Sequence, residues 1–284
     1  MSVTDGPGVA PASASLAHSW VGPAAGDVTL VLHGGGPGCH SVSDFGAVLA
    51  ACPARRWLCL DLPAYGSSPS RAELTEADGR EPTLAEAVER TLRGLGLEKV
   101  DVLAQSLGGI VALELAARRP ELIDRIALIG SQPTPSPGAA RSLSRRPELG
   151  ASAREEYYGG SGPSPAKMRA LIAGLEWWDA AAIPDSTVLA RHRASTTPIA
   201  LAQAQDSARP PVADIGELLH CVAAPTLVMW GRHDPFGGPD YAGALADTLA
   251  RGDLAVIGRT AHHPQAERPG VVAALSDAFL KGDG

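Results

Sequence analysis

The segment "VDVLAQSLGGIVALELAARR", residues 100–119, joins a predicted strand to a predicted helix through one tight turn. Its first six residues form a largely apolar run, typical of a strand buried on both faces. Ser106 follows this run, and small residues, Ala104 and Gly108, stand two positions before and after it. The pattern predicts a nucleophile elbow, a strained strand-to-helix turn that exposes a reactive serine. The alternative is a tight turn without a chemical role.

Other apolar runs of strand length alternate with helical patterns, which predicts a mostly parallel sheet covered by helices. We expect strands at residues 28–33, 57–61, 100–105, 125–130, 226–231 and 254–257, and helices at 84–95, 107–119, 239–250 and 270–280. The chain has 284 residues. This length fits a single α/β body of up to ~250 residues with an insertion.

The alternation breaks between the fourth and fifth predicted strands, where the chain becomes rich in Pro, Gly and Ser. Two segments of this stretch, "SPAKMRALIAGLEWW" and "DSTVLARHRAS", carry apolar residues at helical spacing. We therefore expect a helical lid at residues 133–213, inserted into an α/β core formed by residues 1–132 and 214–284. The lid is expected to pack over the mouth of the active site.

A carboxylate and a histidine follow the last two predicted strands. Asp234 comes after the strand "TLVMWG", and His262 comes after the strand that ends in "LAVI". A serine hydroxyl needs a neutral imidazole to accept its proton, and the resulting imidazolium needs a fixed carboxylate. Enzymes with a nucleophile elbow on an α/β sheet carry these groups in the order Ser, Asp, His. We expect Ser106 as nucleophile, His262 as base and Asp234 as the orienting acid, with His263 as the rival base.

The glycine run "HGGGPG", residues 33–38, follows the first predicted strand. A tetrahedral oxyanion needs backbone N–H donors, usually one from such a loop and one from the residue after the nucleophile. We therefore expect the amides of Gly35 and Leu107 to form an oxyanion hole, and Gly36 to border the substrate. The run lacks the Lys-Ser/Thr ending of a P-loop and the spacing of a dinucleotide fingerprint. His33 is expected to be structural.

Composition narrows the function further. The formal net charge of −7, without a Lys/Arg run, argues against a nucleic-acid surface. No apolar run reaches the ~18 residues of a membrane span, and residues 1–26 lack the features of a secretory signal. The cysteines and histidines show neither CxxC, HExxH nor zinc-ligand spacing. We expect a cytoplasmic protein with free thiols that acts on a small molecule without a metal or organic cofactor.

Five motifs together resemble one family: "HGGGPG", "DLPAYGSS", "QSLGG", "WGRHD" and "AHHPQAERP". They are similar to motifs of the α/β-hydrolases that cleave meta-cleavage products of aromatic degradation, which are vinylogous 1,5-diketones broken at a carbon–carbon bond. The resemblance covers nearly the whole chain. In that family a glutamate stands five residues after the catalytic histidine, and His262 and Glu267 match this spacing. The resemblance implies the α/β-hydrolase fold and a homodimer or larger assembly.

The resemblance also implies substrate-binding residues. Family members carry a lid arginine that binds the substrate carboxylate, and Arg191 matches it; the alternative is a solvated helix residue like Arg193. A guanidinium fork suits a planar carboxylate. Three residues depart from the family pattern: Gln105 and Asp44 stand where asparagines are usual, and His263 stands where a tryptophan is usual. We expect all three to shape the substrate pocket.

The function expected first is hydrolysis of a carbon–carbon bond in a vinylogous diketone or β-diketone-like small molecule by Ser-His-Asp chemistry. Two alternatives use the same fold. One is a carboxylesterase or a prolyl-type aminopeptidase, and the other is a non-hydrolytic cyclase or lyase of specialised metabolism. The peptidase needs acidic lid residues that receive a free amine, whereas Arg191 would repel that amine. The candidate acids are Glu155, Glu156, Glu176 and Asp179.

Overall fold

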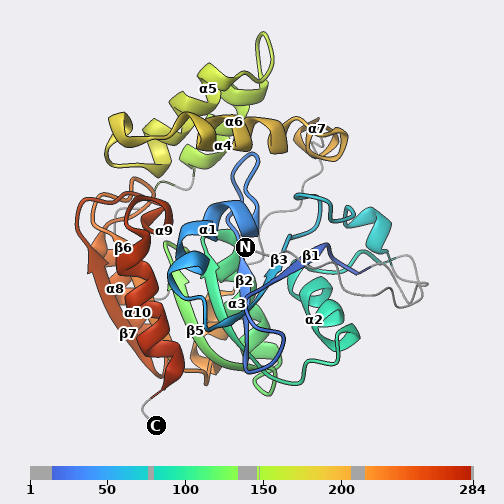
Figure 1. Cartoon of the computed structure of the whole chain (residues 1–284), viewed down its shortest axis with the longest axis vertical. Coiled ribbons are helices and arrows are strands. Elements are labelled where there is room, and N and C mark those ends of the chain that lie inside the picture. Colours follow the sequence, from blue (N-terminus) through green and yellow to red (C-terminus); the bar gives the residue numbers. More distant parts are fainter. Residues whose placement is uncertain (1–14, 76–79, 134–145, 147, 206–214, 283–284) are drawn as a thin grey trace.

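The computed structural model describes residues 15–75, 80–133, 146, 148–205 and 215–282, and in these ranges a seven-stranded sheet forms the centre of the protein (Figure 1). Its strands are β1 (His18–Val21), β2 (Val28–Leu32), β3 (Arg56–Leu60), β4 (Val100–Gln105), β5 (Ile123–Ile129), β6 (Thr226–Gly231) and β7 (Gly252–Ile257). Their spatial order is β1-β3-β2-β4-β5-β6-β7. β1 pairs antiparallel with β3, and the following pairs are parallel.

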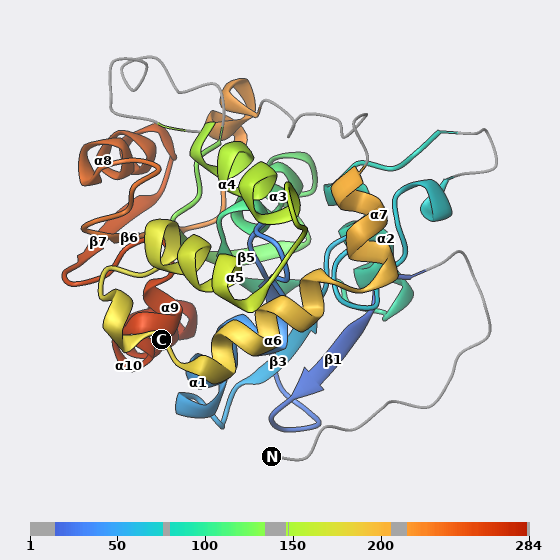
Figure 2. The ribbon, with the colours of Figure 1, turned by 90° about the horizontal axis from the view of Figure 1, so that it is seen from above.

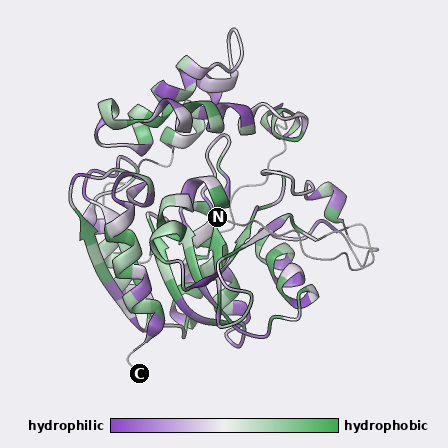
Figure 3. Ribbon diagram, viewed as in Figure 1, coloured by the Kyte–Doolittle hydropathy of each residue, from purple (hydrophilic) through white to green (hydrophobic). Residues whose placement is uncertain are grey.

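Helices cover both faces of this sheet (Figure 1). Because side chains alternate along a strand, Leu30 and Leu32 of β2 pack into one core while Val31 packs into the other. The first core includes α2 (Leu84–Gly94), α3 (Leu107–Arg118) and α8 (Pro239–Thr248), and the second includes α1 (Ser41–Ala51) and α10 (Pro269–Lys281). The expected mostly parallel sheet is therefore confirmed. Figure 3 shows that its strands are mostly hydrophobic.

A further group of helices lies between β5 and β6 in the chain and forms a layer over one end of the sheet (Figures 1 and 2). They are α4 (Glu148–Tyr158), α5 (Pro165–Leu171), the π-helical turn η3 (Ile172–Glu176), η4 (Ala180–Ala182), α6 (Asp185–Ser195) and α7 (Pro198–Gln205). These helices have their own hydrophobic cluster, which includes Tyr157, Met168 and Val188. Both helical segments expected here are present. The expected lid boundary at residue 133 borders residues 134–145, and the one at residue 213 falls within residues 206–214; both segments lie outside the described residues.

The sequence did not predict β1 or α1. β1 is a short edge strand whose residues are mostly not fully buried, so it lacks the continuous apolar run of the central strands. α1 buries Phe45, Val48 and Leu49, but small and polar residues between them weaken its helical pattern. The remaining short helices, which connect strands or precede α10, are η1 (Ala72–Leu74), η5 (Gly216–Cys221) and α9 (Pro264–Glu267).

Gly108 lies where α3 closely approaches the end of β2. Its N–H donates to His33 O at 3.1 Å, and a Cβ on Gly108 would lie 2.6 Å from the carbonyl oxygens of His33 and Leu32. We expect Gly108→Ala to destabilise the fold by about 1–3 kcal/mol, because backbone atoms must shift to admit the methyl group. The measurement is the urea concentration at the midpoint of unfolding.

Gly94→Ala is the matched control, because a Cβ on Gly94 in α2 would meet nothing within 4 Å. Alanine favours a helix over glycine by roughly 0.5–1 kcal/mol, so this variant should be as stable as the wild type or slightly more so. Equal midpoints for the two variants would show that the approach at Gly108 imposes no constraint.

Candidate active site

Ser106 occupies the turn between β4 and α3. Its φ of 49° and ψ of −114° place a residue other than glycine in a strained region of backbone space. The turn is held by the Ser106 N–H, which donates to Ile129 O of β5 at 2.8 Å. Although Ser106 is the N-cap of α3, its side chain makes no capping hydrogen bond. The hydroxyl is therefore free to serve a purpose other than capping.

Asp234 and His262 form a buried pair beyond the ends of β6 and β7. His262 Nδ1 lies 2.7 Å from Asp234 Oδ2, and the other carboxylate oxygen, Oδ1, accepts the Phe236 N–H at 2.9 Å. The ring of Phe236 packs on His262 with a centroid distance of 4.4 Å. A carboxylate held at both oxygens keeps the proton of a neutral imidazole on Nδ1. Nε2 of His262 is then the nitrogen that can accept a proton.

The residues after β4, β5, β6 and β7 meet at one edge of the sheet. A Cβ on Gly130, just after β5, would lie 3.1 Å from His262 Nδ1 and 3.3 Å from Asp234 Oδ2. Gln105, directly before Ser106, donates from Nε2 to His262 O at 3.2 Å. The described residues include no hydrogen bond from Ser106 to His262, a contact that in many enzymes tightens only in the substrate complex.

The glycine run lies beside the start of α3. A Cβ on Gly35 would lie 3.2 Å from Leu107 Cδ2, and Tyr65 OH donates to Gly35 O at 2.7 Å. Leu107 is the first residue of α3, where N–H groups have no acceptor within the helix. Within the described ranges, neither the Gly35 nor the Leu107 amide donates to a protein acceptor. Two backbone donors beside Ser106 are thus available for an anion.

His33 has a structural position at the start of the glycine run. It donates from Nδ1 to Gly34 O at 2.7 Å and accepts the Leu62 N–H at Nε2 at 2.9 Å, so this fully buried ring is neutral. Burial lowers the pKa of His33 from its usual 6.5 to about 3. The unfolded chain therefore takes up this proton below pH 6.5, while the folded protein takes it up only near pH 3. Stability contributed by His33 is present above pH 6.5 and is lost as the pH falls.

We expect neutral His33 to account for about 2 kcal/mol of lost unfolding free energy between pH 7 and pH 5. His33→Gln removes the titrating ring and keeps an acceptor for the Leu62 N–H. Its unfolding free energy should therefore fall by about 2 kcal/mol less between pH 7 and pH 5 than that of the wild type. Urea unfolding at both pH values measures it. The matched control, His220→Gln at an exposed position, should keep the wild-type slope. An unchanged slope in His33→Gln would contradict a neutral His33.

Arg191 of α6 is buried, so the alternative of a solvated helix residue is wrong. Its Nη1 and Nη2 donate to Oε2 and Oε1 of Glu176, both at 2.9 Å, and its Nε donates to Pro37 O at 3.0 Å. Arg193 is exposed. Burial alone would raise the pKa of Glu176, but Arg191 offsets this and the pKa is lowered to about 2. The carboxylate that Arg191 binds in this structure is therefore that of Glu176.

The three residues that were expected to shape the substrate pocket make different hydrogen bonds in the structure. Asp44, in the first turn of α1, accepts the His40 N–H at 3.1 Å, and burial raises its pKa, with partial compensation from Arg191. Gln105 is fully buried and holds the loop of His262. His263 donates its backbone N–H to Glu176 O at 3.0 Å, and burial lowers its pKa to about 3.

The contacts of one further carboxylate, that of Glu267, were not predicted from the sequence. Glu267 of α9 accepts the N–H of Ala261 at 2.6 Å and that of Trp178, which follows η3, at 2.7 Å. The family spacing between His262 and Glu267 marked this residue but did not assign it a contact. The structure shows that it fixes the loop that carries His262 and ties that loop to the chain after η3.

Comparison with known proteins identifies the family. The model of the alpha/beta hydrolase fold family matches residues 28–269. This chain belongs to the α/β-hydrolase family. Among curated relatives, this hydrolase is 28% identical over 268 residues to the 2-hydroxymuconate semialdehyde hydrolase of Pseudomonas sp. (strain CF600), covering 90% of this chain and 87% of the relative. It is 27% identical over 265 residues to the 2-hydroxy-6-oxo-6-phenylhexa-2,4-dienoate hydrolase of Comamonas testosteroni, covering 90% and 88%.

Solved structures agree on the fold of this α/β hydrolase. The 2-hydroxy-6-oxo-6-phenylhexa-2,4-dienoate hydrolase of Rhodococcus sp. strain RHA1 superposes with a TM-score of 0.76 at 23% identity, over 95% of this chain and 96% of that one. A meta-cleavage product hydrolase from Pseudomonas fluorescens IP01 gives a TM-score of 0.75 at 20% identity, over 93% of both chains.

The acidic residues that a peptidase would need do not form an amine site in this α/β hydrolase. Glu155, Glu156 and Asp179 are exposed, and Asp179 accepts the Ala181 N–H as a helix cap. Glu176 is buried but already paired with Arg191. The prolyl-type aminopeptidase alternative is therefore not favoured.

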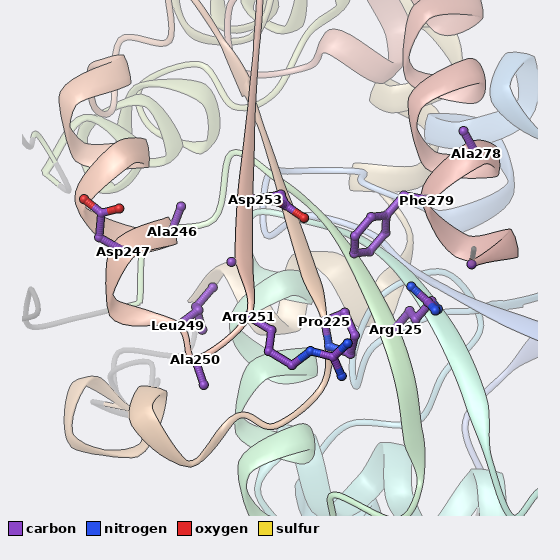
Figure 4. Close-up of a pocket in the computed structure, with 12 residues that line it drawn as sticks. Arg125, Pro225, Ala246, Asp247, Leu249, Ala250, Arg251, Asp253, Ala278 and Phe279 are labelled. Carbon is purple, nitrogen blue, oxygen red and sulfur yellow. The ribbon is translucent and has the colours of Figure 1, made fainter. Parts of the chain in front are cut away.

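A separate pocket lies at the opposite end of the sheet (Figure 4). Its lining residues come from the starts of β6 and β7 and from the ends of α8 and α10, including Pro225, Arg251 and Phe279. The triad candidates, by contrast, follow the carboxyl ends of the strands. Among the described residues, no group of three or more His, Cys, Asp or Glu is placed to hold a metal ion, and no helix is long and apolar enough to cross a bilayer.

Proposed function

We propose that this hydrolase cleaves a carbon–carbon bond in a vinylogous diketone or β-diketone-like small molecule, with Ser106, His262 and Asp234 as its catalytic triad. The proposal of hydrolase chemistry rests on one observation. The fixed Asp234–His262 pair and the strained Ser106 turn both follow the carboxyl ends of strands of the same sheet. The bond type is supported by the relatives, whose names describe hydrolases of 2-hydroxy-6-oxo-dienoates and of 2-hydroxymuconate semialdehyde.

The first half of the reaction forms an acyl-enzyme. His262 assists ketonisation of the dienol, after which Ser106 Oγ adds to the carbonyl carbon and gives its proton to His262 Nε2. The oxyanion accepts hydrogen bonds from the amides of Gly35 and Leu107, and Asp234 stabilises the imidazolium. Collapse of this intermediate breaks the carbon–carbon bond, whose electron pair leaves with the dienol fragment. His262 returns its proton to that fragment.

The second half clears the acyl-enzyme. Water gives a proton to His262 and adds to the acyl carbon, and the same two amides bind the second oxyanion. Loss of Ser106 Oγ, which takes the proton back from His262, releases a carboxylic acid. Each step uses only these proposed groups and one water molecule.

The proposal extends to the organisation of the protein. The helices from α4 to α7 act as a lid, residues 133–213, on a core of residues 1–132 and 214–284. The four cysteines are free thiols, which supports a reducing, cytoplasmic location. The family resemblance supports a homodimer, and light scattering of the purified protein tests it through the molar mass.

The test uses synthetic 2-hydroxy-6-oxo-6-phenylhexa-2,4-dienoate and its neutral primary carboxamide. Loss of visible absorbance reports turnover, and chromatography identifies benzoate, the acid that carbon–carbon cleavage releases from either compound. We expect benzoate from the wild type and none from Ser106→Ala. Hydrolysis of a p-nitrophenyl ester without benzoate from either compound would reject carbon–carbon cleavage and leave a carboxylesterase.

A further inference from the structure

The Glu176–Arg191 pair lies between the glycine run and the loop that carries His262. Glu176 ends η3 and Arg191 lies on α6, and their side chains are only 6% and 4% exposed. A Cβ on Gly36 would lie 3.0 Å from Arg191 Nη2 and 3.2 Å from Glu176 Oε1. On the other side, Glu176 Oε2 lies 3.5 Å from Nδ1 of His263, the residue next to His262. The pair therefore borders both the glycine run and the histidine loop.

The hydrogen bonds of this pair leave little for another carboxylate. Two guanidinium nitrogens of Arg191 each donate to one oxygen of Glu176, and the third donates to Pro37 O. This bidentate geometry is the one in which a guanidinium best recognises a carboxylate. A substrate carboxylate would have to displace Glu176 or bind beside it as a second buried anion. Two carboxylates within hydrogen-bond reach of the same guanidinium repel each other strongly when water is excluded from the site.

Neighbouring groups add no positive charge to compensate. The imidazoles of His33 and His263 are buried, and burial lowers the pKa of each to about 3, so both are neutral near pH 7. The Cys39 thiol and the Asp44 carboxyl also act on Arg191, and neither can carry a positive charge. Among the described neighbours of Arg191, Glu176 already neutralises its charge.

We propose that Glu176 is a specificity-determining residue that occupies Arg191, so that the site selects diketone-like substrates with a neutral group, rather than a carboxylate, beside Gly36. Amides, esters and simple ketones fit this class. The inference rests on the proposed function, because it names the substrate class of the same site. It also gives Glu176 a role that differs from the free-amine receptor of a peptidase.

The experiment compares kcat/KM for the dienoate and for its primary carboxamide, two substrates that differ by one charge. We expect the wild type to favour the carboxamide by about tenfold or more, a ratio that corresponds to about 1.4 kcal/mol. In Glu176→Gln the freed Arg191 should attract the carboxylate. The ratio should then move toward the dienoate by about tenfold or more, mainly through a lower KM for the dienoate.

Two further variants separate specificity from folding. Glu155→Gln removes one negative charge from an exposed position on α4 and should keep the wild-type ratio. The double variant Glu176→Gln, Arg191→Gln replaces a buried ion pair by two amides and should keep the carboxamide preference even if the single variant does not fold. The proposal fails if the wild type favours the dienoate, or if Glu176→Gln changes the ratio no more than Glu155→Gln does.

A second substrate pair keeps this test independent of the proposed bond type. If neither dienone compound is cleaved, carbon–carbon hydrolysis fails. The same ratios are then measured with 4-acetoxybenzoate and 4-acetoxybenzamide, whose esters need only the serine chemistry and carry the same difference in charge. A neutral preference that Glu176→Gln reverses on these esters supports the role of Glu176. An equal ratio in both proteins overturns it.

Discussion

Ser106→Ala is expected to lower kcat by about 10⁶-fold on whichever substrate the wild type turns over. The variant lacks the oxygen that forms the acyl-enzyme, while the amides of Gly35 and Leu107 stay in place and should sustain only the residual rate from oxyanion stabilisation and binding. Single-turnover assays at high enzyme concentration, in which samples are quenched at intervals, can measure such a low rate.

The control for this prediction is Ser43→Ala, which removes an exposed hydroxyl from α1 and should leave kcat unchanged. Circular dichroism should give the same spectrum for both variants and the wild type. A fall of less than tenfold in Ser106→Ala, with the fold intact, would mean that another group attacks the substrate.

Asp234→Asn is expected to lower kcat by about 10⁴-fold while the protein stays folded. The side chain of Asp234 is fully buried and accepts from His262 Nδ1. An asparagine amide at this position can donate to Nδ1, which places the imidazole proton on Nε2, the nitrogen that must accept the proton of Ser106. The measurement is kcat at pH 7 with the substrate used for the wild type.

The matched control is Asp247→Asn, an acid at an exposed position on α8. It changes the net charge equally and should keep wild-type kcat. If Asp234→Asn retained more than a tenth of wild-type kcat, the orienting role of Asp234 would be wrong and another acid would have to hold His262.

The central strands could be predicted from the sequence because burial on both faces leaves a strong signature. β4 and β6 begin and end at the expected residues, 100–105 and 226–231. β7 begins two residues before the expected start because Gly252 and Asp253, which pair with β6, lie at a partly exposed sheet edge and carry no apolar signal. Periodicity reports burial, so it is weakest at edges.

The residues of the candidate site also differ in how well the sequence predicts them. Ser106, Asp234 and His262 could be predicted because each follows a recognisable strand and the chemistry requires their residue types. The partner of Arg191 could not, because η3 and α6 are separate elements whose packing brings Glu176 to Arg191. From the sequence, Glu176 is only one of four acids that could receive a free amine, and nothing in the sequence pattern links it to Arg191.

The most direct test of the proposed triad is covalent labelling with a fluorophosphonate, read by intact mass and peptide mapping. The triad predicts one adduct per chain, on the peptide that contains Ser106, with labelling that falls sharply in Asp234→Asn and disappears in Ser106→Ala. A folded wild-type protein that takes up no label, or that carries it on another residue, would contradict the assignment of Ser106 as the nucleophile.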